Sequence, residues 1–315
     1  MQLRLYGVGA LWACALVMWP RQANRLTLLD NAQQTQAAGE GLYKSSLTQA
    51  NFGMLGFHLY DTNENKKHWN IRSKFAELHR KENYAFMQEV IAEFFAKTGN
   101  VVETRSKFGR SMLDKEIVEL EEDVSIQSHK GYLFNVTQLT YDGKSHEFHS
   151  DSIINMKGPN IDRPILLLKG TGLNADIDRE HFIVKKNVTA QKKLKNSQWL
   201  KVTARHGEFF TDEQRAVFRS DVRTIMPNLN MTSDYFEMLI SEEEESIFAR
   251  GNVRMLSKKR RGSAETAILQ TSNNRIILEG KARIESKDNE IEGKRIILHT
   301  DDDRVEVVQA EGSVN

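Results

Sequence analysis

The stretch Gly251-Asn252-Val253-Arg254-Met255 joins two turn-forming residues to an alternation of apolar and charged side chains, and it recurs along the chain. Its first apolar residue returns at positions 124, 188, 222, 253, 282 and 314, in steps of 64, 34, 31, 29 and 32 residues. The long first step contains a similar alternation, Ile154-Asn155-Met156, near its midpoint. Alternation in short runs bounded by turn formers is typical of half-buried β-strands. We therefore interpret each recurrence as a turn followed by the start of a strand.

A second kind of strand is expected between these positions. It begins at Val202-Thr203-Ala204-Arg205, Met231-Thr232-Ser233-Asp234, Gly262-Ser263-Ala264-Glu265 and Glu292-Gly293-Lys294-Arg295. One repeat is then a strand, a turn and a return strand, which cannot bury its apolar face alone but can do so when successive repeats stack. Many strands without long helices between them predict an antiparallel all-β fold.

One segment is ambiguous. Between Glu82 and Lys97, the apolar residues Phe86, Val90, Ile91, Phe94 and Phe95 lie at helical spacing, whereas the flanking sequence alternates. A helix and a pair of strands are both compatible with this pattern.

The N-terminus carries an uncharged apolar run from Leu5 to Trp19, which is followed by Pro20-Arg21. Counted from Leu3, and so with Arg4 included, the segment has 17 residues, the short limit of a membrane span of about 17–25 residues. We expect residues 1–20 to form one transmembrane helix and residues 21–50 a tether. A cleaved signal peptide is the alternative.

Composition excludes several classes of protein. The formal net charge is +1, without the basic excess expected of a nucleic-acid partner. A single cysteine, Cys14, can form neither an internal disulfide nor a Cys-rich zinc site. His146 and His149 do not have the spacing of a helical zinc-protease pair, so solvated strand residues are the preferred interpretation. No catalytic constellation stands out, and we predict no enzymatic activity, metal or cofactor.

The repeat resembles the LptA/OstA-like domain of lipopolysaccharide transport, most clearly from Val202 to Val314. The preceding part is similar to LptC, the membrane-anchored periplasmic member of that machinery. The segments that carry this second resemblance, besides the N-terminal run, are Trp69–Ala76, Glu119–Ile126 and Ser150–Met156. We accordingly expect an LptC-like jellyroll over 51–195 and an LptA/OstA-like jellyroll over 196–315.

The resemblance implies an antiparallel β-jellyroll of stacked V-shaped strand repeats, whose apolar interior carries the acyl chains of lipopolysaccharide toward the outer membrane. It also implies an inner-membrane anchor, with most of the chain in the periplasm. The implied partners are LptB/LptF/LptG-like subunits of an inner-membrane ABC transporter and an LptA-like or LptD-like jellyroll that docks by strand pairing. A membrane-tethered structural or adhesive β-solenoid without lipid cargo is the alternative function.

The apolar alternates of the predicted strands are the candidate site residues. In a closed sandwich they form only a core, and in an open V they also line the acyl path. They are Ile126, Val136, Phe148, Ile154, Met156, Phe209, Phe218, Met231, Phe236, Met238 and Met255.

Two further features have open interpretations. Gly312 and Val314 belong to the last recurrence and are a candidate docking edge, unless Val314 simply closes the last strand. The basic run Lys258-Lys259-Arg260-Arg261 lies between predicted strands. It is either a solvated hairpin loop or a contact for anionic groups at the mouth of the groove.

Overall fold

The computed structural model describes residues 52–63, 66–240, 246–270, 274–287, 289–299 and 304–308. The expected anchor at 1–20, the tether at 21–50 and the candidate docking residues Gly312 and Val314 lie outside these ranges. The described residues contain no helix that is long and apolar enough to cross a membrane.

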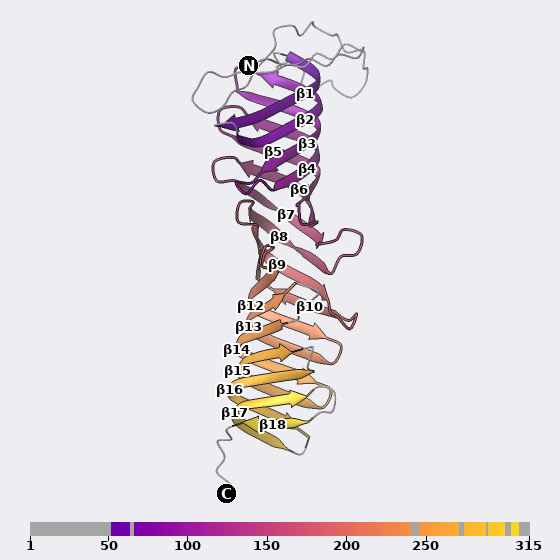
Figure 1. Cartoon of the computed structure of the whole chain (residues 1–315), viewed down its shortest axis with the longest axis vertical. Helices are drawn as coiled ribbons and strands as arrows, with labels where there is room; N and C mark the ends of the chain where they lie inside the picture. The colour runs from indigo at the N-terminus through magenta and orange to yellow at the C-terminus, as the bar shows by residue number, and fades with distance from the viewer. Residues whose placement is uncertain are drawn as a thin grey trace. The chain divides into compact units, whose positions relative to one another are not determined.

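Within the described residues, the chain forms eighteen β-strands (Figure 1). In chain order they are β1 (Phe52–Asn63), β2 (Lys66–His79), β3 (Tyr84–Phe95), β4 (Val101–Met112), β5 (Ile117–Gln127), β6 (Leu133–Asp142), β7 (Glu147–Gly158), β8 (Leu166–Asp176), β9 (His181–Lys193), β10 (Trp199–Ala204), β11 (His206–Phe210), β12 (Arg215–Met226), β13 (Leu229–Leu239), β14 (Ser246–Ser257), β15 (Arg260–Gln270), β16 (Arg275–Ser286), β17 (Glu290–His299) and β18 (Val305–Val308).

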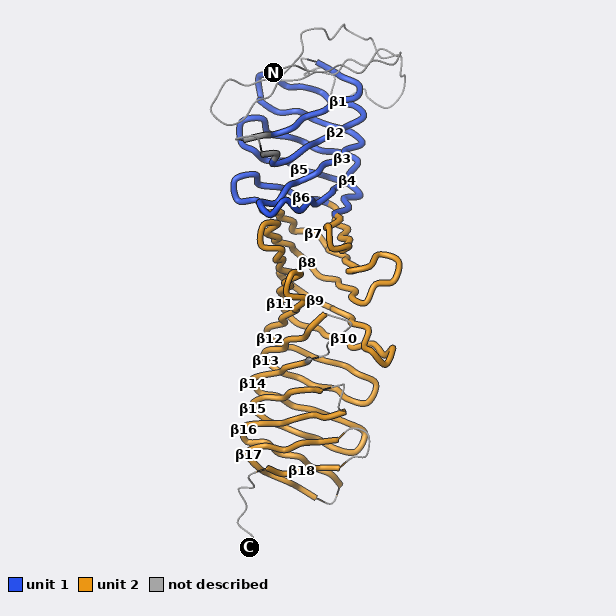
Figure 2. Tube along the Cα trace, in the orientation of Figure 1, with its two compact units in different colours: residues 1–126, 138–146 blue, residues 127–137, 147–315 orange. Residues whose placement is uncertain are grey.

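The strands divide into two compact units (Figure 2). Unit 1 holds the described residues up to Ile126 together with Gln138–His146, and in it β1 to β4 pair antiparallel in chain order. Unit 2 holds Gln127–Thr137 and the described residues from Glu147 onward. In unit 2, β7 to β9 and then β12 to β18 pair antiparallel with their neighbours in the chain. β10 and β11 together take one place, because each pairs with both β9 and β12.

The ambiguous segment is a strand, β3. Its buried residues alternate up to Met87 and again from Val90, and Glu89 between them has a left-handed φ of 53°. This left-handed residue shifts the alternation by one position, while the pairing register with β2 and β4 is the same on both sides of it. Since Phe86 and Ile91 also make the other face partly apolar, a shifted strand imitated helical spacing.

The turn-forming residues of the repeat lie in the middle of strands and not before them, so our sequence interpretation of their place was wrong. Asp123, Asn187, Asp221, Asn252 and Lys281 all have left-handed φ values, from 48° to 54°. In unit 2 the pairing register shifts at the same points, for example between Arg250 and Val253. A bulge bends its strand, and the aligned bulges make a crease between two half-strands. We call this row of residues the crease.

The antiparallel all-β jellyroll expected from the sequence is confirmed. The hairpin turns occupy other positions, such as 211–214 and 258–259. A thirty-residue repeat is therefore a pair of bent strands with two turns. The crease recurs in every second strand from β12 to β16, which explains why its residues carry the period.

An aromatic column occupies the interior of unit 2. Phe134 meets Phe182 edge to face at 5.0 Å between ring centroids, and Phe182 stacks on Phe209 at 4.6 Å. Phe209 then meets Phe218 at 5.6 Å, and Phe218 meets Phe236 at 6.0 Å. Such geometries add about 0.5–1.5 kcal/mol per pair beyond the burial of apolar area.

The crease predicts that Gly280→Ala is destabilising. Gly280 has a φ of +76°, and a Cβ there would lie 2.6 Å from Glu265 Oε2 and 2.8 Å from Glu265 Cβ. We expect a loss of about 1–2 kcal/mol in the free energy of unfolding, measured by urea denaturation. The control is Gly53→Ala, whose Cβ would lie at an ordinary 3.5 Å from Phe75. Equal effects of the two substitutions would contradict this role of the crease.

The aromatic column predicts a large difference between neighbours on β11. Phe209 is fully buried, whereas Phe210 is half-buried between His181 and Arg215. Phe209→Ala should lower the free energy of unfolding by about 3–5 kcal/mol because it leaves a cavity. Phe210→Ala should lower it by only about 1 kcal/mol, since it removes a partly solvated cation–π contact. Similar losses in a denaturation experiment would show that the column does not carry the core.

Candidate functional site

All eleven predicted site residues are buried, each with 5% or less of its surface exposed. Ile126 lies on β5 in unit 1, and the other ten belong to unit 2. Those ten are Val136 on β6, Phe148, Ile154 and Met156 on β7, Phe209 on β11, Phe218 on β12, Met231, Phe236 and Met238 on β13, and Met255 on β14. The strands of unit 2 thus bring a set of phenylalanine and methionine side chains to one apolar interior.

Glycines on the inner face make room for these side chains. Met231 pairs with Met255, and Met255 pairs with Gly262 on the next strand. A Cβ on Gly262 would lie 2.7 Å from Met255 Cγ. Ile154 likewise pairs with Gly170, where a Cβ would lie 2.3 Å from Val184 Cγ1. Flexible thioether chains beside glycines give a surface that can adapt its shape to an apolar ligand.

The turns of unit 2 separate charge between the two edges of the sheet. An antiparallel meander returns to the same edge after every second strand, with β10 and β11 counted as one. The turns at 128–132, 159–165, 194–198, 227–228 and 258–259 share one edge and contain five Lys or Arg and one acid, Asp162. The turns at 177–180 and 211–214 share the other and contain four acids and one Arg. We call these edges the basic rim and the acidic rim.

The two rims touch near one end of unit 2. Glu180 of the acidic rim pairs with Lys130 of the basic rim, and His129 Nε2 lies 3.4 Å from Glu180 Oε1. The contact between Phe134 and Phe182 also joins the two sides. These contacts hold the two rims together at this point. We call the opening between the rims the mouth of the interior, and the pairing of Glu180 with Lys130 the clasp.

Tyr132 follows His129 and Lys130 in the turn at 128–132 of the basic rim. It packs against Gly158, where a Cβ would lie 2.4 Å from Tyr132 Cδ1. Burial raises the pKa of the Tyr132 phenol to about 12, because a phenolate is poorly solvated there. Tyr132 is thus a buried, uncharged aromatic side chain at this end of the mouth.

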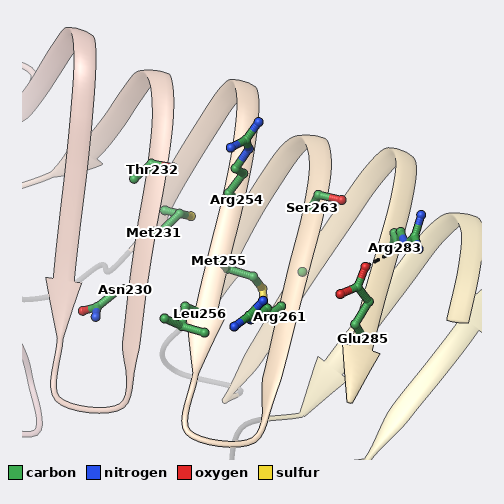
Figure 3. A pocket seen from close by; sticks show the side chains of 11 residues that line it. Asn230, Met231, Thr232, Arg254, Met255, Leu256, Arg261, Ser263, Arg283 and Glu285 are labelled. Carbon is green, nitrogen blue, oxygen red and sulfur yellow. Dashed lines mark ion pairs between the residues drawn. The ribbon is translucent and has the colours of Figure 1, made fainter. Parts of the chain in front are cut away.

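A pocket of about 410 Å³ lies on the half-strands of β13 to β16 next to the basic rim (Figure 3). Successive side chains of a strand point to opposite faces. Met231 and Met255 are buried, whereas Thr232, Arg254 and Leu256 are exposed. The pocket is thus a depression of the outer face, lined by Arg254, Arg261 and Arg283 around the strand backbone.

The interpretation of His146 as a solvated strand residue was wrong. His146 is buried in a turn of unit 1, and its ring lies 5.4 Å from that of His68 and 6.5 Å from that of Tyr141. His68 Nδ1 lies 3.5 Å from Asp61 Oδ2. Among the described residues, no group of three or more His, Cys, Asp or Glu side chains is arranged to hold a metal ion.

The sequence reasoning missed the two rims and the clasp. Separation of charge between alternate turns was readable once the turns were placed correctly, because the charges themselves are in the sequence. The pairing of Glu180 with Lys130 depends on how strongly the strands bend, and the crease residues indicate where a strand bends but not by how much.

Comparisons with known proteins support the resemblance. The family described as lipopolysaccharide-assembly, LptC-related, matches residues 42–193. The family described as LptA/(LptD N-terminal domain) LPS transport protein matches residues 201–304. No curated protein matches the chain.

Among solved structures, a match is LptH of Pseudomonas aeruginosa, described as the LptA homologous periplasmic component of the lipopolysaccharide transport device. It is 21% identical, and the match covers 36% of this chain and 85% of that chain, with a TM-score of 0.34.

The two family matches follow each other along the chain, the LptC-related one first and the LptA-like one second. Both families consist of non-enzymatic transport bridge proteins. The chain is therefore an LptC-like, non-enzymatic protein of lipopolysaccharide transport with an LptA-like region in its C-terminal half.

Proposed function

We propose that the chain is an inner-membrane-anchored periplasmic bridge that binds the acyl chains of lipopolysaccharide in its β-jellyroll interior and passes them toward the outer membrane. The observation that carries this proposal is the apolar inner face, where ten of the eleven predicted residues gather in one unit. The family matches support the same task.

The energetics favour acyl chains as cargo. Each buried CH₂ group contributes about 0.8 kcal/mol, so a lipid with several chains gains strong binding without polar recognition. A groove that binds so tightly cannot release its cargo unaided. We therefore propose that LptB/LptF/LptG-like subunits of an ABC transporter drive the movement, with residues 1–20 as the membrane anchor beside them and residues 21–50 as the tether.

Strand pairing is the proposed mode of assembly. Within the described residues, β18 pairs with β17, and its Val307 and Val308 are exposed. An open strand edge is a template for addition of another strand. We propose that this end of the sheet, with Gly312 and Val314 beyond it, receives an LptA-like or LptD-like jellyroll.

The chain would then combine two jellyrolls in one polypeptide. We propose 51–195 as the LptC-like part and 196–315 as the LptA/OstA-like part, and the ranges of the two family matches support this division.

A structural or adhesive solenoid is the competing function. The close contacts of the aromatic column favour it, because a tightly packed interior leaves no space for lipid. Lipid transport requires that the two half-sheets move apart while cargo is bound. This opening would take place along the part of unit 2 that lies away from the pairing of Glu180 with Lys130.

The proposal predicts where lipid touches the chain. A photoreactive residue at Phe236 or Met156, both buried, should form adducts with lipopolysaccharide in cells or in reconstituted vesicles. The same residue at Glu237, which follows Phe236 and lies on the outer face, should not. Adducts at Glu237 with none at Phe236 and Met156 would exclude interior transport and favour the solenoid.

The docking proposal has its own test. Removal of residues 309–315, which include Gly312 and Val314, should abolish binding of an LptA-like or LptD-like partner in a pull-down assay. Photo-adducts of lipopolysaccharide at Phe236 should persist in the same variant, because the interior strands are unchanged. Undiminished partner binding would show that docking uses another surface.

A further inference from the structure

We propose that Arg260 forms, at the basic rim of unit 2, a binding site for the phosphate groups of a lipid whose acyl chains lie in the interior. This inference rests on the proposed function and adds a polar contact to it. It assigns the headgroup to one side of the mouth, the side formed by the turn at 258–259.

Arg260 starts on the inner face of its strand. It is the first residue of β15 and shares its alternation with the buried Gly262 and Ala264. Its neighbour Arg261 is exposed on the outer face and lines the pocket of Figure 3. Two consecutive arginines therefore lie on the inner and the outer face of the sheet at the basic rim.

One guanidinium nitrogen of the partly buried Arg260 lacks a hydrogen-bond partner among the described residues. This atom is Nη1, and it is itself buried. A buried charged donor without an acceptor is costly. A ligand oxygen at this atom would supply the missing hydrogen bond.

The backbone of Arg260 is held in place independently of its side chain. Ser257 Oγ accepts a hydrogen bond from the Arg260 amide at 3.1 Å and donates one to the Arg260 carbonyl at 3.3 Å. The tight turn between these residues thus fixes where the side chain leaves the strand. A fixed starting point reduces the entropy that the arginine loses when it binds a ligand.

Two acids on the neighbouring strands β16 and β17 are paired with Arg283. Glu285 lies 3.1 Å from Arg283 Nε, and Glu290 pairs with the same guanidinium. Arg283 thus holds both carboxylates at its own position on β16. Within the part of the chain that the structure describes, Lys258, Arg260 and Arg261 form no ion pair with a carboxylate.

Cationic side chains at another place on the basic rim bind an anionic group of the protein itself. At the other end of unit 2, Lys130 and His129 hold the carboxylate of Glu180 across the mouth. Lys192 is a second cation of this rim that shares the alternation of buried residues, with 2% of its surface exposed. An anion from a ligand would take at Arg260 the place that Glu180 takes near Lys130.

Phosphate is the anion that fits both the residue and the cargo. The planar guanidinium donates two parallel hydrogen bonds to phosphate oxygens. Met255, which pairs with the adjacent Gly262, brings apolar surface to within two residues of the arginine. A ligand with acyl chains beneath a phosphorylated sugar matches this order of apolar and cationic groups.

The test compares bisphosphorylated lipid A with monophosphoryl lipid A, using the full chain in detergent and dissociation constants from fluorescence titration. Wild type should prefer the bisphosphorylated form, and Arg260→Gln should weaken its binding by about tenfold and remove the preference. The control is Arg275→Gln, which replaces an exposed arginine at the start of β16 on the opposite edge. This variant should retain the affinity for bisphosphorylated lipid A and the preference for it. Arg260→Lys keeps the positive charge but cannot donate two parallel hydrogen bonds, so its loss of affinity should be intermediate. This variant replaces Arg260→Gln in the test if Arg260→Gln does not fold.

The outcomes separate this inference from the proposed function. An unchanged preference in Arg260→Gln, with photo-adducts still formed at Phe236, overturns the phosphate site and leaves interior transport intact. Absence of binding of either lipid to wild type overturns both. Competition by inorganic phosphate as strong as that by the bisphosphorylated lipid identifies a free-phosphate site and overturns the lipid assignment.

Discussion

The bent strands of unit 2 accommodate an irregularity near their midpoints, and in every second strand from β12 to β16 the residues there adopt left-handed backbone angles that side chains usually avoid. Gly251 with Asn252, and Gly280 with Lys281, satisfy this constraint as consecutive left-handed pairs. Glycine adopts these angles without strain, and Asn with little. Because the bulges fall in register from strand to strand, their bends add up to one crease. Because of the crease, the two half-sheets face each other and enclose an apolar interior between them.

The interior and the rims have different physical tasks. Stacked rings such as Phe182 and Phe209 and the adaptable Met231 and Met255 supply apolar surface, which binds alkyl chains without regard to their detailed shape. Directional interactions are left to the rims, where charge is separated between the two edges. The clasp of Glu180 by Lys130 shows that these charges act across the mouth. A bridge for amphiphilic cargo needs both properties. Its interior has to accept alkyl chains of different shape, and its edges have to bind polar groups at defined positions.

Much of the fold could be predicted from the sequence, because strand alternation and turn residues are local signals. The all-β class, the repeat and the burial of residues such as Phe236 follow from period-two patterns alone. The place of the turn residues could not be predicted, since Asn252 before an apolar residue has the same sequence signature at a hairpin and at a mid-strand bulge. β3 was ambiguous for the same reason, because the shift at Glu89 imitates helical spacing. The burial of His146 could not be predicted because its ring lies beside that of His68, which is far away in sequence.

The central claim is that the crease creates an interior for acyl chains. It is tested most directly by an experimental structure of the chain with lipopolysaccharide bound. We expect acyl-chain density between the half-strands of β12 to β14, in contact with Phe218, Met231 and Phe236. Acyl-chain density confined to the outer face, over Arg254 and Leu256, with the aromatic column still closed, would contradict it.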